Sequence, residues 1–270
     1  MGRTNEVEVA DVSVRSSLDD IIHHVWADAS ASTTAQKAIV TLTLEDAAEV
    51  NARIIKSLPG DCITAPCTDT YMDCKEPDLY PEEFVRSLHI SGVPPGVLQL
   101  KVGARYIIIR NIDHAHGIVN GAQVLCTALT SRHFIGAASH YSSSNHELCQ
   151  QRQFTQSAGT LLYGPHAGSR VMLPRITYII TTSQSHLPFA IMRRQFALIP
   201  GYAFTVHRSQ GSSLELLGIY FNGAPFCHGL LYTALSRVRG DWRCITVHVP
   251  TDSSPSLQNC VKPHVLQCLL

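Results

Sequence analysis

Hydrophobic and polar residues follow two different patterns along this chain. Residues 38–44 are mostly apolar and β-branched, which predicts a buried strand. A helix is expected directly after it, because Thr43 and Asp46 have the spacing of a capping box and Pro59-Gly60 marks an end. One face of this helix carries apolar residues at helical spacing: Ala47, Val50, Ile54 and Leu58. A strand followed at once by a helix is typical of an α/β domain.

The second pattern fills residues 93–183, where short apolar runs are separated by turn-forming residues. The runs predict the strands of a small all-β module: 98–102, 105–110, 121–129, 160–163, 170–173 and 176–181. The stretch 140–158 is polar and aperiodic, so we expect a long loop there. Strand and helix patterns then alternate again, with strands at 196–204, 216–221 and 244–249 and a helix at 229–238.

These patterns predict an α/β domain in two pieces, residues 37–92 and 184–250, with the β-module inserted at 93–183. A short helix at 80–88 is expected before the insertion, since Pro81 suits a first helical turn. The ends of the chain are expected to be an acidic leader or linker at 1–36, with a short amphipathic stretch at 18–26 that fits a helix, and a loosely ordered tail at 251–270.

Composition narrows the class of protein. The 270 residues are 45% hydrophobic with 16% charged, which predicts a globular chain with a sizeable core. No run of eighteen apolar residues or secretory signal pattern is present, so we expect an intracellular protein, nuclear by preference, without a membrane span; a mitochondrial or viral setting stays open. Nine cysteines without a CxxC pair favour free thiols over a disulfide framework or a zinc site.

The net charge of zero conceals an asymmetry between the two parts of the chain. Residues 1–83 carry 6 Lys and Arg against 16 Asp and Glu, whereas residues 84–270 carry 15 against 5. A positive field over the larger part would attract a polyanion such as a nucleic acid, although chance surface composition gives the same totals. Charge alone therefore names no partner.

One segment with possible chemistry runs from His207 through Arg208, Ser209 and Gln210 to Gly211. It follows an apolar strand, and the glycine allows backbone N–H groups to approach a phosphate or a nucleotide strand. An ordinary polar turn at the end of a strand explains the same residues, and the spacing alone favours that simpler explanation.

A second segment is the helix at 229–238, on which Arg237 follows Leu230 and Ala234 on one face. An arginine in a last helical turn can reach across a cleft. It can equally be a cation placed favourably at a helix C-terminus, a contribution of about 0.3–1 kcal/mol.

Together, these two segments resemble the last two motifs of the PIF helicase family, which includes the PIF-like helicases of helitron transposons. The family's turn and helix patterns appear in order as HRSQG at 207–211, a leucine at 214, GIY at 218–220 and YTALSRV at 232–238. Further stretches that are similar to family blocks lie upstream: LPFAIMRRQF at 187–196, LYPEEF at 79–84, LKVGA at 100–104, IRN at 109–111, GIVNG at 117–121 and LPRIT at 173–177. The resemblance runs from about Lys37 to Val249.

The resemblance implies a fold and a function. The fold is a second RecA-like helicase motor domain of the P-loop NTPase type, without the P-loop, interrupted by a small SH3-like β-barrel. The function is that of the C-terminal portion of an ATP-dependent helicase that moves 5′ to 3′ on single-stranded DNA, with ATP and Mg²⁺ used only together with a first motor domain. DNA repair and recombination are the corresponding processes.

Site residues are carried over from the same resemblance. Arg237 corresponds to the arginine finger, which stabilises charge on the γ-phosphate of ATP. Ser209, Gln210 and Gly211 would couple nucleotide to DNA, with His207 and Arg208 near the DNA. Asn120 and Gly121 correspond to a turn of the inserted module and are assigned to DNA binding, with a neighbouring hairpin expected to touch DNA or the partner domain.

Departures from the family pattern leave an alternative open. The chain has no Gly-Lys dipeptide, so it lacks a Walker A loop, and the acidic pair Asp19-Asp20 does not follow a buried strand as a Walker B pair would. We therefore expect a missing first motor domain and no ATPase activity of the chain alone. The alternative is a motorless, transposon-derived remnant that binds nucleic acid or a partner protein. No metal site is expected.

Overall fold

The chain folds into two units, which are described separately below. The structure is a computed structural model, and it describes residues 6–8, 13–27, 36–131, 154–162, 165, 167–223, 225–227, 229–238, 242–248 and 256–258. Unit 1 comprises residues 1–57 and 201–270, and unit 2 comprises residues 58–200. No helix in these described ranges is long and apolar enough to cross a membrane.

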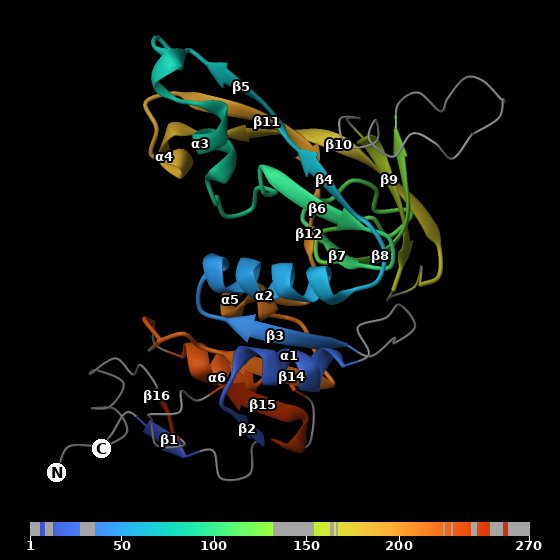
Figure 1. The fold of residues 1–270 in the computed structure, drawn as a ribbon, viewed down its shortest axis with the longest axis vertical. Helices are drawn as coiled ribbons and strands as arrows, with labels where there is room; N and C mark the ends of the chain where they lie inside the picture. Colours follow the sequence, from blue (N-terminus) through green and yellow to red (C-terminus); the bar gives the residue numbers. More distant parts are fainter. Residues whose placement is uncertain are drawn as a thin grey trace. The chain divides into compact units, whose positions relative to one another are not determined.

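Unit 1 is built on a five-stranded parallel sheet (Figure 1). Its strands, in spatial order, are β13 (Ala203–Thr205), β3 (Lys37–Thr41), β14 (Leu216–Tyr220), β15 (Ile245–His248) and β2 (Ser13–Arg15). The strands β3 and β14 lie inside the sheet and are almost entirely buried, which explains why their sequences are continuous apolar runs. The predicted α/β class is therefore confirmed for this unit.

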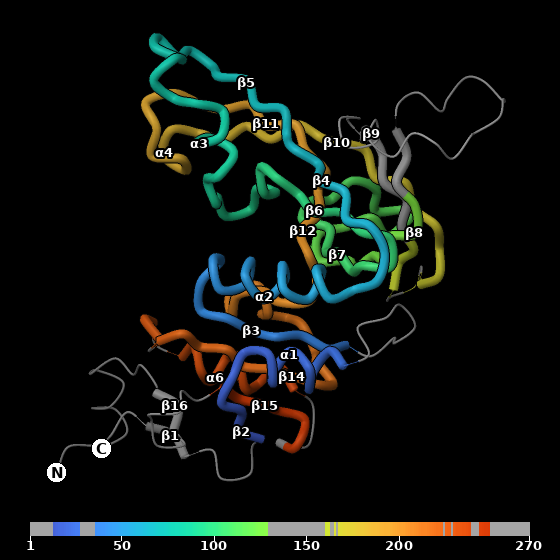
Figure 2. Tube along the Cα trace, in the orientation of Figure 1, coloured from blue at the N-terminus to red at the C-terminus, as the bar shows by residue number. Residues whose placement is uncertain are grey.

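Helix α2 (Leu44–Ser57) follows β3 directly, as the sequence predicts (Figure 2). The predicted cap forms, because the Asp46 amide donates to Thr43 Oγ1 at 3.0 Å. Two short helices of the same unit follow later strands: α5 (Val206–Ser209) after β13 and α6 (Leu230–Leu235) after β14.

Residues 13–27, predicted as part of a leader, belong to the fold of unit 1. Strand β2 pairs in parallel with β15, and helix α1 (Leu18–Trp26) packs against β14 and β15. Gly218 in β14 makes room for this helix, because a Cβ there would lie 3.0 Å from the Ile21 side chain. The prediction of a leader is wrong here because β2 pairs with a strand more than 200 residues away, which no local pattern reveals.

The two ends of the chain contribute one more pair of strands. The backbones of β1 (Glu6–Glu8) and β16 (Ser256–Gln258) pair antiparallel. The rest of the predicted tail at 251–270 lies outside the described residues.

Unit 2 is built on a seven-stranded antiparallel sheet. Its strands, in spatial order, are β12 (Leu198–Pro200), β7 (Arg105–Ile108), β8 (Gln123–Ser131), β9 (Phe154–Leu161), β10 (Arg170–Ile180), β11 (Ala190–Phe196) and β5 (Thr68–Met72). A separate pair, β4 (Cys62–Pro66) and β6 (Val97–Lys101), and the short helices α3 (Glu82–Ser87), α4 (Thr182–Ser185) and η1 (Pro77–Leu79) complete the unit.

The β-rich unit is larger than the predicted insertion at 93–183. Strand β5 pairs with β11, and Val85 of α3 packs in a core with Ile180, Phe189 and Ile191. Residues 58–92 and 184–200 therefore belong to unit 2 and not to the α/β unit. The sequence pattern missed this because β5 and β11 are joined only by pairing between residues more than 100 positions apart.

Some predicted boundaries change within the sheet. The strands expected at 170–173 and 176–181 form one continuous strand, β10, and the strand expected at 196–204 divides among β11, β12 and β13. The end of the predicted loop at 140–158 is part of β9, while its earlier residues lie outside the described ranges.

Candidate nucleic-acid interface

The predicted turn at 207–211 lies at the end of β13, the edge strand of the parallel sheet. It forms the single-turn helix α5 and then a reversal at Gly211, whose φ of 84° favours glycine. Two backbone bonds close the turn: the Gln210 amide donates to His207 O at 3.4 Å, and the Ser212 amide donates to Ser209 O at 3.0 Å.

Ser209 faces the interior of this turn. Its side chain is fully buried, and its hydroxyl donates to the Val206 carbonyl oxygen at 2.6 Å. The hydroxyl proton is therefore used inside the protein, and the predicted role of Ser209 toward nucleotide or DNA stays a prediction. Gln210 and Gly211, by contrast, are exposed.

Arg208 is half-buried, and burial lowers the pKa of its guanidinium below the usual value. Within the part of the chain that the structure describes, this guanidinium has no hydrogen bond or ion pair. A partly desolvated cation without a counter-charge favours binding of an anion. Beside it, the exposed ring of His207 lies 6.5 Å from the ring of Phe226, which is 60% exposed.

The predicted helix at 229–238 is shorter in the structure, where α6 spans Leu230–Leu235 and buries Leu230, Leu231 and Ala234. Arg237 follows it and folds back over the last turn. Its Nε donates to the Thr233 carbonyl oxygen at 2.9 Å, and its Nη2 donates to Ser236 Oγ at 2.8 Å. The guanidinium is therefore held at the helix C-terminus, where the carbonyl dipoles favour a cation.

The two motif segments meet in unit 1. Helices α5 and α6 contact each other, and the Leu214 amide donates to the Arg237 carbonyl oxygen at 2.9 Å. Leu214 and Val238 form an isolated parallel bridge at the same point. The backbone of Arg237 is thus joined directly to the segment that leaves the α5 turn.

Asn120 and Gly121 belong to unit 2. They form the turn before β8, where Gly121 has a φ of 90° and its amide donates to Ile108 O at 2.8 Å. The Asn120 amide donates to Asn111 Oδ1 at 2.8 Å. Both residues are exposed, and their predicted contact with DNA stays a prediction.

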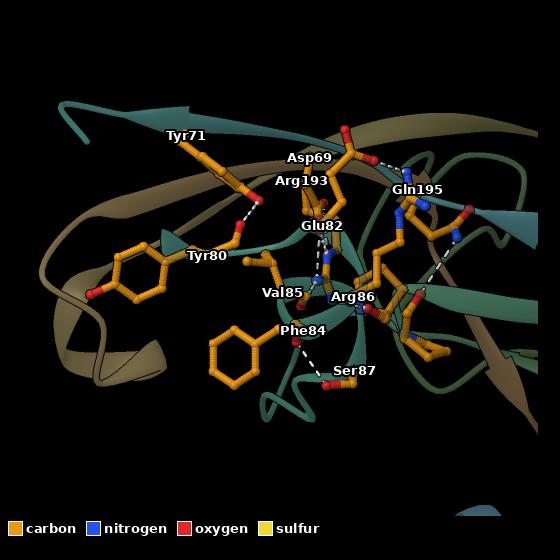
Figure 3. A network of polar contacts seen from close by, with 12 residues as sticks. Asp69, Tyr71, Tyr80, Glu82, Phe84, Val85, Arg86, Ser87, Arg193 and Gln195 are labelled. Atoms are coloured by element: carbon orange, nitrogen blue, oxygen red, sulfur yellow. Dashed lines mark hydrogen bonds and ion pairs between the residues drawn. The ribbon is translucent and has the colours of Figure 1, made fainter. Parts of the chain in front are cut away.

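Unit 2 also contains a buried ion pair that the sequence patterns did not indicate (Figure 3). Arg193 is fully buried and binds both carboxylate oxygens of Asp69, with Nε–Oδ1 and Nη2–Oδ2 distances of 2.9 Å. The same guanidinium donates to the carbonyl oxygens of Val85 at 2.7 Å and Pro94 at 3.4 Å. Arg193 thereby ties α3 and the segment at 94–96 to the sheet.

A pocket of about 350 Å³ opens between these two tied segments. Its lining comes from Glu83, Arg86, Ser87, Leu88, His89, Pro95, Gly96 and Val97. None of the predicted site residues lines it.

No group of three or more His, Cys, Asp or Glu that is able to hold a metal ion occurs among the described residues. Six cysteines within the described ranges are free thiols, as predicted: Cys62, Cys67, Cys74, Cys126, Cys227 and Cys244. Burial raises the pKa of Cys67 to about 12 and of Cys126 to about 11, which makes both thiols unreactive at neutral pH.

Comparison with known proteins gives consistent results. A family model described as the 2B domain of DNA helicase Pif1 matches residues 83–129. The ATP-dependent DNA helicase PIF1 of Mus musculus is 28% identical over 199 residues, which cover 72% of this chain and 24% of that protein. The Pif1 helicase structure from Candida albicans superposes with a TM-score of 0.58 at 20% identity, over 86% of this chain and 48% of that chain.

A Bacteroides Pif1 structure in complex with ADP-AlF3 and ssDNA superposes with a TM-score of 0.56 at 19% identity. That match covers 93% of this chain and 48% of the Bacteroides chain. This chain therefore spans about a quarter of the length of the curated relatives that it matches and about half of the solved structures.

The shared architecture, a parallel α/β sheet whose chain is interrupted by a β-rich unit, is that of a RecA-like helicase fold. Within that class, the family-model match and the curated relatives agree on one family. The chain is similar to PIF-family DNA helicases in sequence and in fold, which confirms the resemblance that the motifs indicate.

Proposed function

We propose that this chain is the C-terminal portion of an ATP-dependent 5′-to-3′ DNA helicase, consisting of the second motor domain with its inserted β-module. The observation that carries the proposal is the backbone bond from Leu214 to Arg237, which joins the α5 turn to the end of α6. In this proposal the turn contacts single-stranded DNA and Arg237 contacts ATP. The bond between them couples the two events.

On the DNA side, the outward-facing residues of the turn supply the contacts. Arg208 offers a partly desolvated guanidinium to a phosphate, and Gln210 offers an exposed amide. His207 and Phe226 present exposed rings, on which bases stack without sequence preference. Ser209 contributes by keeping the turn closed from inside.

On the nucleotide side, Arg237 acts as the arginine finger. In the structure its guanidinium rests on Thr233 and Ser236, two hydrogen bonds that have to be exchanged for bonds to a phosphate. An arginine delivered to the γ-phosphate stabilises charge in the transition state of phosphoryl transfer. In this proposal a first motor domain binds Mg²⁺ and the β- and γ-phosphates, which is the role of a Walker A loop.

The test is an assembly of this chain with the first motor domain of a PIF-type helicase. We expect DNA-stimulated ATP hydrolysis in the assembly, a loss of at least about 10³-fold in Arg237→Ala, and unchanged binding of single-stranded DNA. Arg53→Ala is the matched control, because it removes an exposed cation of the same unit that pairs with Asp19 and Glu49. Full hydrolysis in Arg237→Ala overturns the assignment.

The same assembly tests the alternative of a motorless binding protein, which the missing Gly-Lys dipeptide favours. That alternative predicts no restored hydrolysis while the chain alone binds single-stranded DNA with an affinity that falls linearly with salt in a log–log plot. Absence of binding at low salt removes both the helicase proposal and the nucleic-acid form of the alternative.

A further inference from the structure

Strand β13 carries the α5 turn, yet it is only three residues long, and among the described strands it has a neighbour on one side only. Its paired side faces β3, with Ala203 opposite Ile39. On its open side, the N–H and the C=O of Ala203 are both bound by one side chain, that of Asn51 on α2.

Asn51 reproduces the hydrogen bonds of a missing neighbouring strand. Its Oδ1 accepts from the amides of Tyr202 at 3.1 Å and Ala203 at 3.0 Å. Its Nδ2 donates to the Ala203 carbonyl oxygen and to the Ala47 carbonyl oxygen, both at 2.7 Å. The side chain is only 5% exposed, and both of its oxygen lone pairs and both of its N–H groups are used.

This arrangement fixes the chain two residues before α5 begins. Ala203 is held on both of its backbone groups by Asn51, and only Phe204 and Thr205 separate it from Val206. A fully satisfied amide in a buried position specifies one geometry, because any shift of the strand leaves a buried polar group without a partner.

We propose that Asn51 is a positioning residue that sets the α5 turn, and through it the DNA contacts of His207, Arg208 and Gln210. The effect of Asn51 on DNA contacts rests on the proposed function. The claim that Asn51 orders the α5 turn does not depend on that function.

The variant Asn51→Asp isolates this role because it keeps the size and the accepting oxygen of the side chain. It replaces Nδ2 by an oxygen that would lie 2.7 Å from the carbonyl oxygens of Ala47 and Ala203. Two hydrogen bonds thereby become repulsive contacts between oxygen atoms. Protonation of the introduced carboxylate restores one donor, so the defect should shrink as the pH falls. Gln184→Glu is the matched control, because the Gln184 side chain acts as an acceptor in unit 2 and Glu keeps that role.

Amide hydrogen exchange of the full chain gives the direct readout. In Asn51→Asp at about pH 7.5 we expect the protection of the Gln210 and Ser212 amides to fall about tenfold, the change expected for one lost hydrogen bond. The Ile21 amide in α1 and the His186 amide in unit 2 should keep their protection. Affinity for a fluorescein-labelled oligothymidylate should fall by a similar factor, and both losses should be smaller at about pH 5.5.

Two results overturn the inference. One is unchanged protection of the Gln210 and Ser212 amides in Asn51→Asp. The other is an equal loss at Ile21, which means that the variant weakens unit 1 as a whole. If the wild-type chain does not bind oligothymidylate, the proposed function fails, and the exchange data still decide whether Asn51 positions the turn.

Discussion

Replacing Asp69 by asparagine should destabilise unit 2 by several kcal/mol. In the structure the Asp69 side chain is only 3% exposed and Arg193 is completely buried, so neither charge is solvated when its partner is lost. The substituted amide keeps one accepting oxygen but removes the counter-charge and turns an N–H group toward Arg193 Nη2. Removing one partner of a buried ion pair costs about 3–5 kcal/mol.

Urea unfolding measures this loss. With a slope of about 2 kcal/mol per molar, a loss of about 4 kcal/mol lowers the midpoint for unit 2 by about 2 M. Both tryptophans of the chain, Trp26 and Trp242, belong to unit 1, so their fluorescence follows that unit while far-UV circular dichroism also follows unit 2. Asp78→Asn is the matched control, since Asp78 is exposed in the same unit.

A double-mutant cycle with Arg193→Met shows whether the pair is the cause. The Arg193→Met substitution alone leaves a buried carboxylate and two carbonyl oxygens, those of Val85 and Pro94, without their donor. In the double variant, which also carries Asp69→Asn, the uncompensated charge disappears and only neutral polar groups remain unsatisfied, so its loss should be well below the sum of the two single losses. Additive losses, or a loss below about 1 kcal/mol for Asp69→Asn, would refute the reasoning.

Two further predictions concern unit 1. Ser17 caps α1 by accepting from the Asp20 amide at 3.1 Å, so Ser17→Ala should lose about 1 kcal/mol in urea unfolding followed by tryptophan fluorescence. Burial lowers the pKa of His248 below 6.5, so the unfolded chain takes up the proton more readily and stability is lost as the pH falls through 6.5. His248→Gln should therefore lose less stability than the wild type between about pH 7.5 and pH 5.5, and an equal loss contradicts this account.

The local sequence pattern predicted a central strand and helix α2 of unit 1 well, because the residues that define each of them are contiguous in sequence. The apolar run at 38–44, the cap at Thr43 and the apolar face of α2 are all contiguous in sequence, and all three appear in the structure. Strands β2 and β5 were missed because they are short, and distant partners decide their pairing. The same limit applies to the contacts of Asn51 with Ala203 and of Arg193 with Asp69, which join residues more than 100 positions apart.

The motif at 207–211 combines residues that maintain the turn with residues that face outward. Helical periodicity in α5 directs Val206 and Ser209 inward, and both are buried, whereas His207 and Gln210 are exposed. Ser209 consequently closes the turn by bonding Val206, Gly211 supplies the positive φ that reverses the chain, and Asn51 holds the strand before it. Some residues of this five-residue motif therefore fix the backbone of the turn. The proposed contacts with DNA depend on the other side chains, which this backbone directs toward solvent.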